Sequence, residues 1–441
     1  MSLPSAVPLT HRSVLTIAVP IMLSNVSEPL IGVVNTAVIG QLPDPYYIGA
    51  IAVGALIFSF IFWGFGFLRL STGGLSAQAV GAGDREELVA VLLRALMIAA
   101  VAGVGLIILS PLIREVAFNL IGGSAEVRQH GETYFNWRIW SAPFAFANYC
   151  VMGWFIGQAK ARLTFLVQLF LNVTNMALSS LFVLKLGMTS DGVGLAALLS
   201  EVSAAVLALT LAYAHVRQMA GHVNRALIFD GPKFRKTIAM NGDVMIRTMC
   251  LVFAFSWFTA RGARAGDVTV AANAVLMHFF EVAAYMIDGF AYASEALVGQ
   301  SVGAGNRQRF RLAVWLTSLW ALVAGLIFSG VIFVAGPVFI DLLTVNPEVR
   351  ETASTYLPWA ALAPFLGTIC FQFDGIFTGA MATRDMRNMM IVSLAIFMAA
   401  WWFLEAQYGN HGLWAALNIF FVARGVTFAS RMPGIERRAF G

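Results

Sequence analysis

Twelve stretches of this chain are apolar over about 20 residues, the length a helix needs to cross a hydrocarbon core. Only 12% of the residues are charged, whereas soluble domains carry about 25%, and the mean hydropathy is +0.78. The connecting segments are short, and none has the size of a soluble domain. We therefore expect an all-α polytopic membrane protein, not an enzyme, with transmembrane helices near 13–39, 47–72, 88–111, 133–157, 163–185, 192–216, 237–261, 268–298, 310–335, 355–380, 387–408 and 411–430.

Other classes of protein find little support in the sequence. The three cysteines lie in apolar stretches and have neither a disulfide pattern nor metal-ligand spacing. No nucleophile, metal or phosphate-loop constellation is present, so we predict no cofactor and no metal site. The apolar run after Arg12 lacks a following cleavage site of small residues, so we interpret it as the first spanning helix and not as a signal peptide.

Basic residues predict the orientation of the chain in the membrane. With twelve spans both termini lie on one side, and cytoplasmic segments carry the excess of Lys and Arg. An inside N-terminus places seventeen basic residues in the cytoplasm and six outside, so we predict cytoplasmic termini and no nucleic-acid partner. The cytoplasmic set is Arg12, Arg85, Lys160, Arg162, Arg217, Arg225, Lys233, Arg235, Lys236, Arg307, Arg309, Arg311, Arg384, Arg387, Arg431, Arg437 and Arg438, and the outer set is Arg114, Arg128, Lys185, Arg261, Arg264 and Arg350.

An internal repeat divides the chain into two halves. Residues 77–85 recur as residues 299–307, and the same offset of 222 maps 126–128 onto 348–350 and 155–157 onto 377–379. Six spans per half give both halves the same orientation, so they are related by a pseudo-two-fold axis along the membrane normal. We predict an N-terminal lobe at 1–216, a cytoplasmic linker at 217–236, a C-terminal lobe at 237–441, and a cavity between the lobes.

The eighth predicted span carries an unusual polar face. Its polar residues follow steps of three and four, which places them on one side of a single long helix. A carboxylate near the bilayer centre costs roughly 2.5–3.5 kcal/mol on insertion scales, so such a face belongs against protein or a wet cavity. We interpret it as a cavity wall in which carboxylates exchange protons. A histidine one turn away can share such a proton, although a satisfied interior histidine is the more common outcome. The residues are His278, Glu281, Tyr285, Asp288, Tyr292 and Glu295.

Other polar residues within the spans have both structural and functional interpretations. Asp243 and Arg247 are four residues apart and can pair on one helix face, either as a structural ion pair or in coupling. Asp374 is a candidate for ion coupling. Glu201 fits a helix–helix hydrogen bond as well as a role in transport, and Glu28 can relieve a kink at Pro29. Five of the seven carboxylates in spans belong to the second half: Asp243, Glu281, Asp288, Glu295 and Asp374, against Glu28 and Glu201.

The first half carries amides in place of most acids. Asn25 and Asn35 lie in the first span, and Asn172 and Asn175 lie in the fifth, where interhelical hydrogen bonding is the interpretation we favour. Pro20 lies inside the first span, where it removes a backbone donor and predicts a hinge.

Four segments, 28–42, 272–277, 285–296 and 386–388, resemble the multidrug and toxic compound extrusion (MATE) transporters, and among them the DNA-damage-inducible protein F (DinF) branch. The resemblance covers nearly the whole chain. It implies a twelve-helix, two-lobed, cation-coupled exporter of amphipathic organic compounds that works by alternating access.

Two positions depart from the pattern of that branch. Asn35 stands where the branch usually has Asp, and Ser179 stands where related proteins often have Asp. Asn cannot exchange a proton, whereas Asp243, Asp288, Glu295 and Asp374 match the family pattern. We therefore predict that ion coupling rests on the second half.

The function predicted from the sequence is a cation-coupled antiporter that exports lipophilic or cationic organic compounds across the cell (inner) membrane. We favour the proton over sodium as the coupling ion. Its partners are the bilayer, a small organic substrate and the coupling ion. The predicted coupling residues are Asp288, Glu295, Asp243, Asp374 and Glu281. The predicted cavity or substrate residues are Asn35, Tyr285, Tyr292, Glu201 and His278, with Pro20 as hinge. A flippase for a lipid-linked substrate is the alternative, although its diphosphate would require more basic residues than these spans contain.

Overall fold

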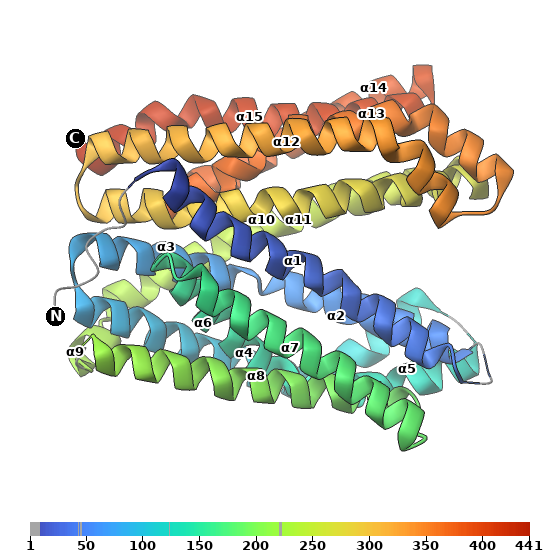
Figure 1. Ribbon diagram of the computed structural model, residues 1–441, viewed down its shortest axis with the longest axis horizontal. Coiled ribbons are helices and arrows are strands. Elements are labelled where there is room, and N and C mark those ends of the chain that lie inside the picture. The colour runs from blue at the N-terminus through green and yellow to red at the C-terminus, as the bar shows by residue number, and fades with distance from the viewer. Residues whose placement is uncertain (1–8, 43, 45, 123, 220–222) are drawn as a thin grey trace. The chain divides into compact units, whose positions relative to one another are not determined.

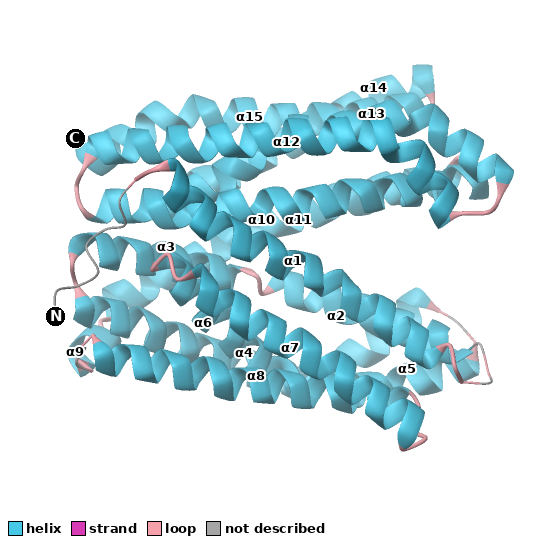
Figure 2. Cartoon of the chain, viewed as in Figure 1, coloured by secondary structure: helices cyan, strands magenta, loops and turns pink. Residues whose placement is uncertain are grey.

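The computed structural model describes residues 9–42, 44, 46–122, 124–219 and 223–441. Helices account for all of the regular structure within these ranges, and no strand occurs in them (Figures 1 and 2). In chain order the elements are α1 (His11–Ile39), α2 (Tyr46–Gly64), α3 (Phe67–Ala82), α4 (Arg85–Ile121), α5 (Ala125–Arg138), η1 (Ile139–Ser141), α6 (Ala142–Gly157), α7 (Ala161–Ser180), η2 (Leu181–Lys185), α8 (Ser190–Gln218), α9 (Arg225–Ile228), α10 (Gly231–Arg264), α11 (Asp267–Gly303), α12 (Arg307–Leu343), α13 (Pro347–Gly379), α14 (Thr383–Tyr408) and α15 (Asn410–Phe440).

Twelve helical segments within the described ranges are long and apolar enough to cross a membrane, as the sequence predicts. Several spans are not single helices. The second is α2 followed by α3, with a turn at Phe65 and Gly66. The fourth is α5, the short 3₁₀ turn η1 and α6, and the seventh includes the one-turn helix α9 before α10. The sequence predicted one continuous helix at 47–72 and at 133–157, because an apolar pattern continues through such breaks, whereas it assigned the residues of α9 to the linker at 217–236.

The 222-residue repeat is also present in the backbone. Left-handed residues terminate helices at equivalent places in the two halves, where the chain must reverse direction between antiparallel helices. Two of the six positions are not glycine and still adopt this conformation. The turn geometry is therefore kept in both halves without requiring glycine at every position. The pairs are Gly83 and Gly305 (φ 73° and 62°), Ala159 and Met381 (60° and 56°), and Gly187 and Gly409 (68° and 54°).

Helix N-caps follow the same repeat. The Asp84 side chain accepts a hydrogen bond from the Glu87 backbone N–H at the start of α4, and Asn306 does the same for Arg309 at the start of α12. Each cap satisfies one of the four backbone donors that a helix start leaves unpaired. A short polar residue at this position is therefore what begins the third span of each half.

Equivalent glycines allow two helices to approach closely in each half. A Cβ added to Gly153 of α6 would lie 2.3 Å from the Arg69 carbonyl oxygen of α3. A Cβ added to Gly375 of α13 would lie 2.0 Å from the Ala291 carbonyl oxygen of α11. These two crossings are 222 residues apart on both partners, and each sets the spacing of the helices that carry the candidate site.

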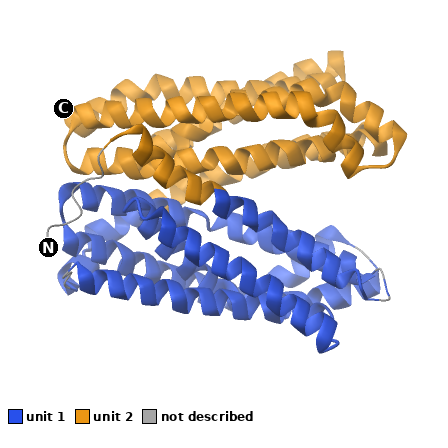
Figure 3. Cartoon of the chain, viewed as in Figure 1, with its two compact units in different colours: residues 1–5, 23–237 blue, residues 6–22, 238–441 orange. Residues whose placement is uncertain are grey.

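The chain divides into two compact units (Figure 3). One contains Leu23–Thr237, and the other contains Ile238–Gly441 together with the described part of the chain up to Met22. The predicted lobes were 1–216 and 237–441. In the structure the first turns of α1 belong to the same unit as the C-terminal half, although the prediction placed them in the N-terminal lobe. The boundary within α1 falls two residues after Pro20, while α1 itself runs as one helix from His11 to Ile39.

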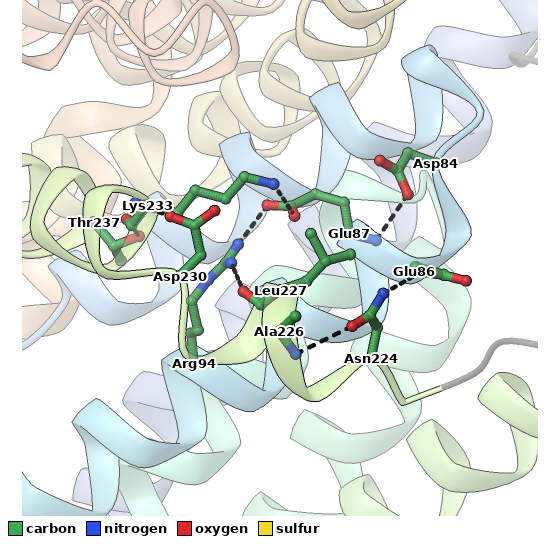
Figure 4. A network of polar contacts seen from close by, with 10 residues as sticks. All are labelled: Asp84, Glu86, Glu87, Arg94, Asn224, Ala226, Leu227, Asp230, Lys233 and Thr237. Carbon is green, nitrogen blue, oxygen red and sulfur yellow. Dashed lines mark hydrogen bonds and ion pairs between the residues drawn. The ribbon is translucent and has the colours of Figure 1, made fainter.

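The predicted linker is bound to the first unit by charged side chains, apart from residues 220–222, which lie outside the described residues. Glu87 of α4 accepts hydrogen bonds from Arg94 and from Lys233 (Nζ to Oε2, 2.7 Å), and the buried Arg94 also donates to the Leu227 carbonyl at 2.7 Å (Figure 4). Asn224 caps α9 and donates to Glu86 at 2.8 Å. The described residues between α8 and α10, 219 and 223–230, are therefore a structured part of the first unit.

Candidate coupling and substrate site

The polar face predicted at 278–295 lies on one uninterrupted helix, α11. Its side chains become steadily more buried along the helix. His278 and Glu281 are exposed and contact each other at 3.3 Å, Tyr285, Asp288 and Tyr292 are half-buried, and Glu295 is only 2% exposed. The face therefore runs from the surface of the second unit into its interior.

The buried end of this face lies where α11 packs against α13. A Cβ added to Gly379 would meet the Glu295 carbonyl oxygen at 2.5 Å and the Gly299 nitrogen at 2.9 Å. Such contact leaves no room for a larger residue and fixes the Glu295 backbone against α13. A carboxylate held in a close-packed crossing can respond to a movement between the two helices.

Asp374 lies between two arginines of other helices. Its Oδ2 accepts a hydrogen bond from Arg424 of α15 at 2.8 Å and contacts Arg247 of α10. Arg424 is fully buried and stacks over the Phe371 and Phe420 rings at 5.7 and 5.5 Å. The cluster contains two guanidinium groups and one carboxylate, so Asp374 is the shared partner of both arginines.

The expected pairing of Asp243 with Arg247 is not formed. Asp243 accepts hydrogen bonds from Arg387 (2.6 Å) and Thr383 (3.2 Å), both on α14, whereas Arg247 pairs with Asp374. Partners from neighbouring helices meet these side chains in the interior, where an ion pair gains from a low dielectric. The i, i+4 spacing alone therefore gave the wrong partners.

Amide side chains of the first unit form interhelical hydrogen bonds, as favoured from the sequence for the fifth span. Asn172 donates to Ser27 at 2.5 Å, linking α7 to α1, and Asn175 donates to Ser200 of α8 at 3.2 Å. Asn35 is buried and donates to Asn175 at 3.5 Å, while its Oδ1 has no hydrogen-bond partner among the described residues. Three helices of the first unit are joined by this network.

Glu201 has a partner that the sequence did not predict. Asn148 of α6 donates to Glu201 Oε2 at 2.7 Å and to the Glu201 backbone carbonyl at 3.2 Å. Arg138 and Glu28 lie close enough to act electrostatically on Glu201, although Glu28 itself is exposed. Asn148 is a buried amide within an apolar stretch, and such a group needs a partner, which is the signal that could have identified it.

The described residues contain no group of three or more His, Cys, Asp or Glu side chains that could hold a metal ion. The contacts described above place the predicted site residues in separate groups. The α11 face and two ion-pair clusters lie in the second unit, and Asn35 and Glu201 lie in the first.

Comparison with known proteins identifies the family. A model of the MatE family matches residues 20–181 and 244–403, one block in each half of the repeat. The chain belongs to the MatE family. Its relatives include the DNA damage-inducible protein F of Escherichia coli (strain K12), which is 36% identical and is matched over 94% of this chain and 90% of that protein.

More distant comparisons agree with this MatE assignment. The probable multidrug resistance protein NorM of Xanthomonas axonopodis pv. citri (strain 306) is 24% identical over 99% of this chain and 96% of its own length. The fold matches the outward-facing structure of a multidrug resistance MATE family transporter with a TM-score of 0.87, at 17% identity and 97% coverage of both chains. At that identity the structural likeness establishes the fold alone.

These findings settle the broad class of the protein. It is a MATE-type transporter and not an enzyme, because members of the family are transporters. With twelve spans and a bacterial relative of this similarity, it is a multi-pass inner-membrane protein that works in a lipid bilayer on a small-molecule substrate. The flippase alternative is not favoured by these comparisons.

Proposed function

We propose that this protein is a proton-coupled antiporter that exports lipophilic or cationic organic compounds by alternating access. The observation that carries the proposal is the polar face of α11, which runs from exposed Glu281 through half-buried Asp288 to buried Glu295. Carboxylates in a membrane span are costly and mark ion or substrate pathways. A graded series of them provides positions where a proton can be held while the helix packing changes.

In this proposal Asp288 and Glu295 are the principal coupling residues. Glu281 and His278 exchange protons at the exposed end of the face, and Tyr285 and Tyr292 contribute ring surface to the substrate. Asp243 and Asp374 act through their ion pairs, which break and re-form as the helices move. Asn35 and Glu201 are cavity or substrate residues of the first unit. Pro20 allows α1 to bend near the boundary between the units.

We also propose that both termini are cytoplasmic. The support is the count of seventeen basic residues against six on the two sets of connecting segments.

The names of the relatives, which include a multidrug resistance protein, support an organic substrate.

The test is efflux of a lipophilic cationic dye such as ethidium from vesicles that contain the purified protein. A pH gradient should drive efflux, and a sodium gradient without a pH gradient should not. Asp288→Asn should reduce pH-driven efflux about tenfold or more, because an amide cannot exchange a proton. Asp267→Asn, an exposed acid at the start of the same helix, is the matched control and should retain the wild-type rate.

Efflux driven by sodium alone would transfer the coupling to sodium. Absence of a response to either gradient would refute the antiporter, and wild-type behaviour of Asp288→Asn would remove this residue from the coupling pathway.

A further inference from the structure

Glu201 differs from the ion-paired carboxylates of the second unit in the kind of group that binds it. Asp243 and Asp374 are held by guanidinium groups. Glu201, which is half-buried in α8, has no Lys, Arg or His within ion-pair distance among the described residues, and an amide donates to it at 2.7 Å. Binding a proton here therefore breaks no ion pair.

The second observation concerns the amide itself. Asn148 is 1% exposed, and its Nδ2 group donates both to the Glu201 carboxylate and to the Glu201 backbone carbonyl. Its Oδ1 has no hydrogen-bond partner among the described residues. A buried acceptor left without a donor costs about 1–3 kcal/mol, so a native structure is expected to supply one in some state.

A protonated Glu201 is the donor that is missing. A carboxylic acid and a primary amide form a cyclic pair, in which the amide N–H donates to one carboxyl oxygen and the carboxyl O–H donates to the amide oxygen. Asn148 already makes the first of these bonds. Adding a proton to the second carboxyl oxygen creates the O–H bond that can reach Oδ1, and losing it restores the ionised form.

The surroundings of Glu201 can stabilise both charge states. Arg138 of α5 and Glu28 of α1 act on it with opposite sign, and Tyr149 of α6 lies within the electrostatic reach of both acids and of Arg138 and Arg69. From α7, the neutral amide of Asn175 donates a hydrogen bond to Ser200, the residue that precedes Glu201. Around the pair of Glu201 and Asn148 there are thus two positive side chains, Arg138 and Arg69, and one negative side chain, Glu28.

We propose that Glu201 and Asn148 form a proton-binding site in the first unit, in which Glu201 carries the proton and Asn148 is a positioning residue that stabilises the protonated form. This inference rests on the proposed function, since it assigns a second carrier for the same proton coupling. It also changes the prediction from the sequence that coupling rests on the second half alone, because the proton carrier comes from α8 and not from the position occupied by Asn35.

The experiment combines efflux with direct detection of the proton. Purified protein is titrated with ethidium in weakly buffered detergent solution, and proton release is followed with a pH indicator. The infrared difference spectrum between acid and alkaline pH reports protonated carboxyl groups. Glu201→Gln should reduce pH-driven efflux about tenfold or more, lower proton release, and remove one protonated-carboxyl band. Glu126→Gln, an exposed acid of the same unit, should leave all three unchanged.

A second variant separates proton binding from a structural role. Asn148→Leu keeps the carboxyl group but removes its partner, so the carboxyl band should persist at a shifted frequency and the pH profile of efflux should move. Wild-type proton release and wild-type efflux in Glu201→Gln would overturn the inference, as would an unchanged band and pH profile in Asn148→Leu.

Failure of the proposed function has a different signature. If the wild-type protein shows no pH-driven efflux, the antiporter proposal fails regardless of Glu201. If the wild type couples efflux to pH and Glu201→Gln does so equally well, the inference about Glu201 fails while the proposed function stands. Should Glu201→Gln not fold, Glu201→Asp provides the same readouts with the carboxylate withdrawn from Asn148.

Discussion

At the scale of single residues, buried charge is unevenly matched in the cluster around Asp374. Two guanidinium groups share this one carboxylate, and Arg424 still has Nε and Nη1 atoms without partners among the described residues. The three side chains therefore do not contribute equally to stability. The carboxylate is the member whose loss leaves the most uncompensated charge.

The asymmetry predicts different costs for two substitutions. Asp374→Asn leaves both arginines without a counter-charge and should lower the free energy of unfolding by about 3–5 kcal/mol. Arg424→Met leaves the Arg247–Asp374 pair intact and loses one charge-assisted hydrogen bond to Asp374, so it should cost less, about 1.5–3 kcal/mol. Denaturation of the purified variants in mixed detergent micelles measures both. Equal losses would show that Arg424 contributes as much as Asp374.

At the scale of helices, α11 and α13 of the second unit cross closely at Gly375. Gly375 permits it, because any Cβ there would lie 2.0 Å from the Ala291 carbonyl oxygen. This contact involves backbone atoms of a helix, which cannot rotate away as a side chain can. The crossing also positions the helix that carries Glu295.

Gly375→Ala should therefore lower the unfolding free energy by about 1–3 kcal/mol, the cost of forcing a group into a packed interior. The control is Gly330→Ala on α12, where an added Cβ meets nothing within 4 Å and helix propensity favours alanine by about 1 kcal/mol. Thermal denaturation in detergent compares the two. A Gly375→Ala variant as stable as Gly330→Ala would contradict the described crossing.

Element boundaries were the part of the secondary structure that the sequence predicted least well. The helix α11 was predicted as one element, because its polar residues keep a helical period through 278–295. Its counterpart in the first half is divided at Phe65 and Gly66, and Gly66 occupies the position equivalent to Asp288, 222 residues earlier. A break inside a uniformly apolar segment leaves no change in periodicity to detect.

At the scale of the whole molecule, the described part of the segment that joins the two halves is bound to the first half through α4. Glu87 binds both Arg94, which also holds the Leu227 carbonyl, and Lys233 at the start of α10 (Figure 4). The corresponding positions of the second half, Arg309 and Leu316, provide no such charge pair. The contact thus belongs to the join between the halves and not to the repeated frame.

Glu87→Gln should loosen this join. A charge-assisted hydrogen bond contributes about 1.5–3 kcal/mol, so local opening should become about tenfold more frequent or more. Limited trypsin digestion measures the opening, because Arg225 is exposed in α9 and Arg235 and Lys236 are exposed in the first turns of α10. Glu115→Gln, an exposed acid on the same helix, should keep the wild-type cleavage rate. Equal cleavage of the Glu87 and Glu115 variants would mean that Glu87 does not hold the segment.

The sequence by itself determined the class of fold and the family pattern, because both depend on properties spread along the chain. Apolar length specifies a membrane span, and a fixed 222-residue offset specifies two equivalent halves. The tertiary structure decided which side chains meet. Asp243 binds Arg387 rather than Arg247, Asp374 binds Arg247 and Arg424, and Glu201 meets Asn148 from a helix more than fifty residues away. These partners come from different helices, and helical periodicity contains information about one helix only.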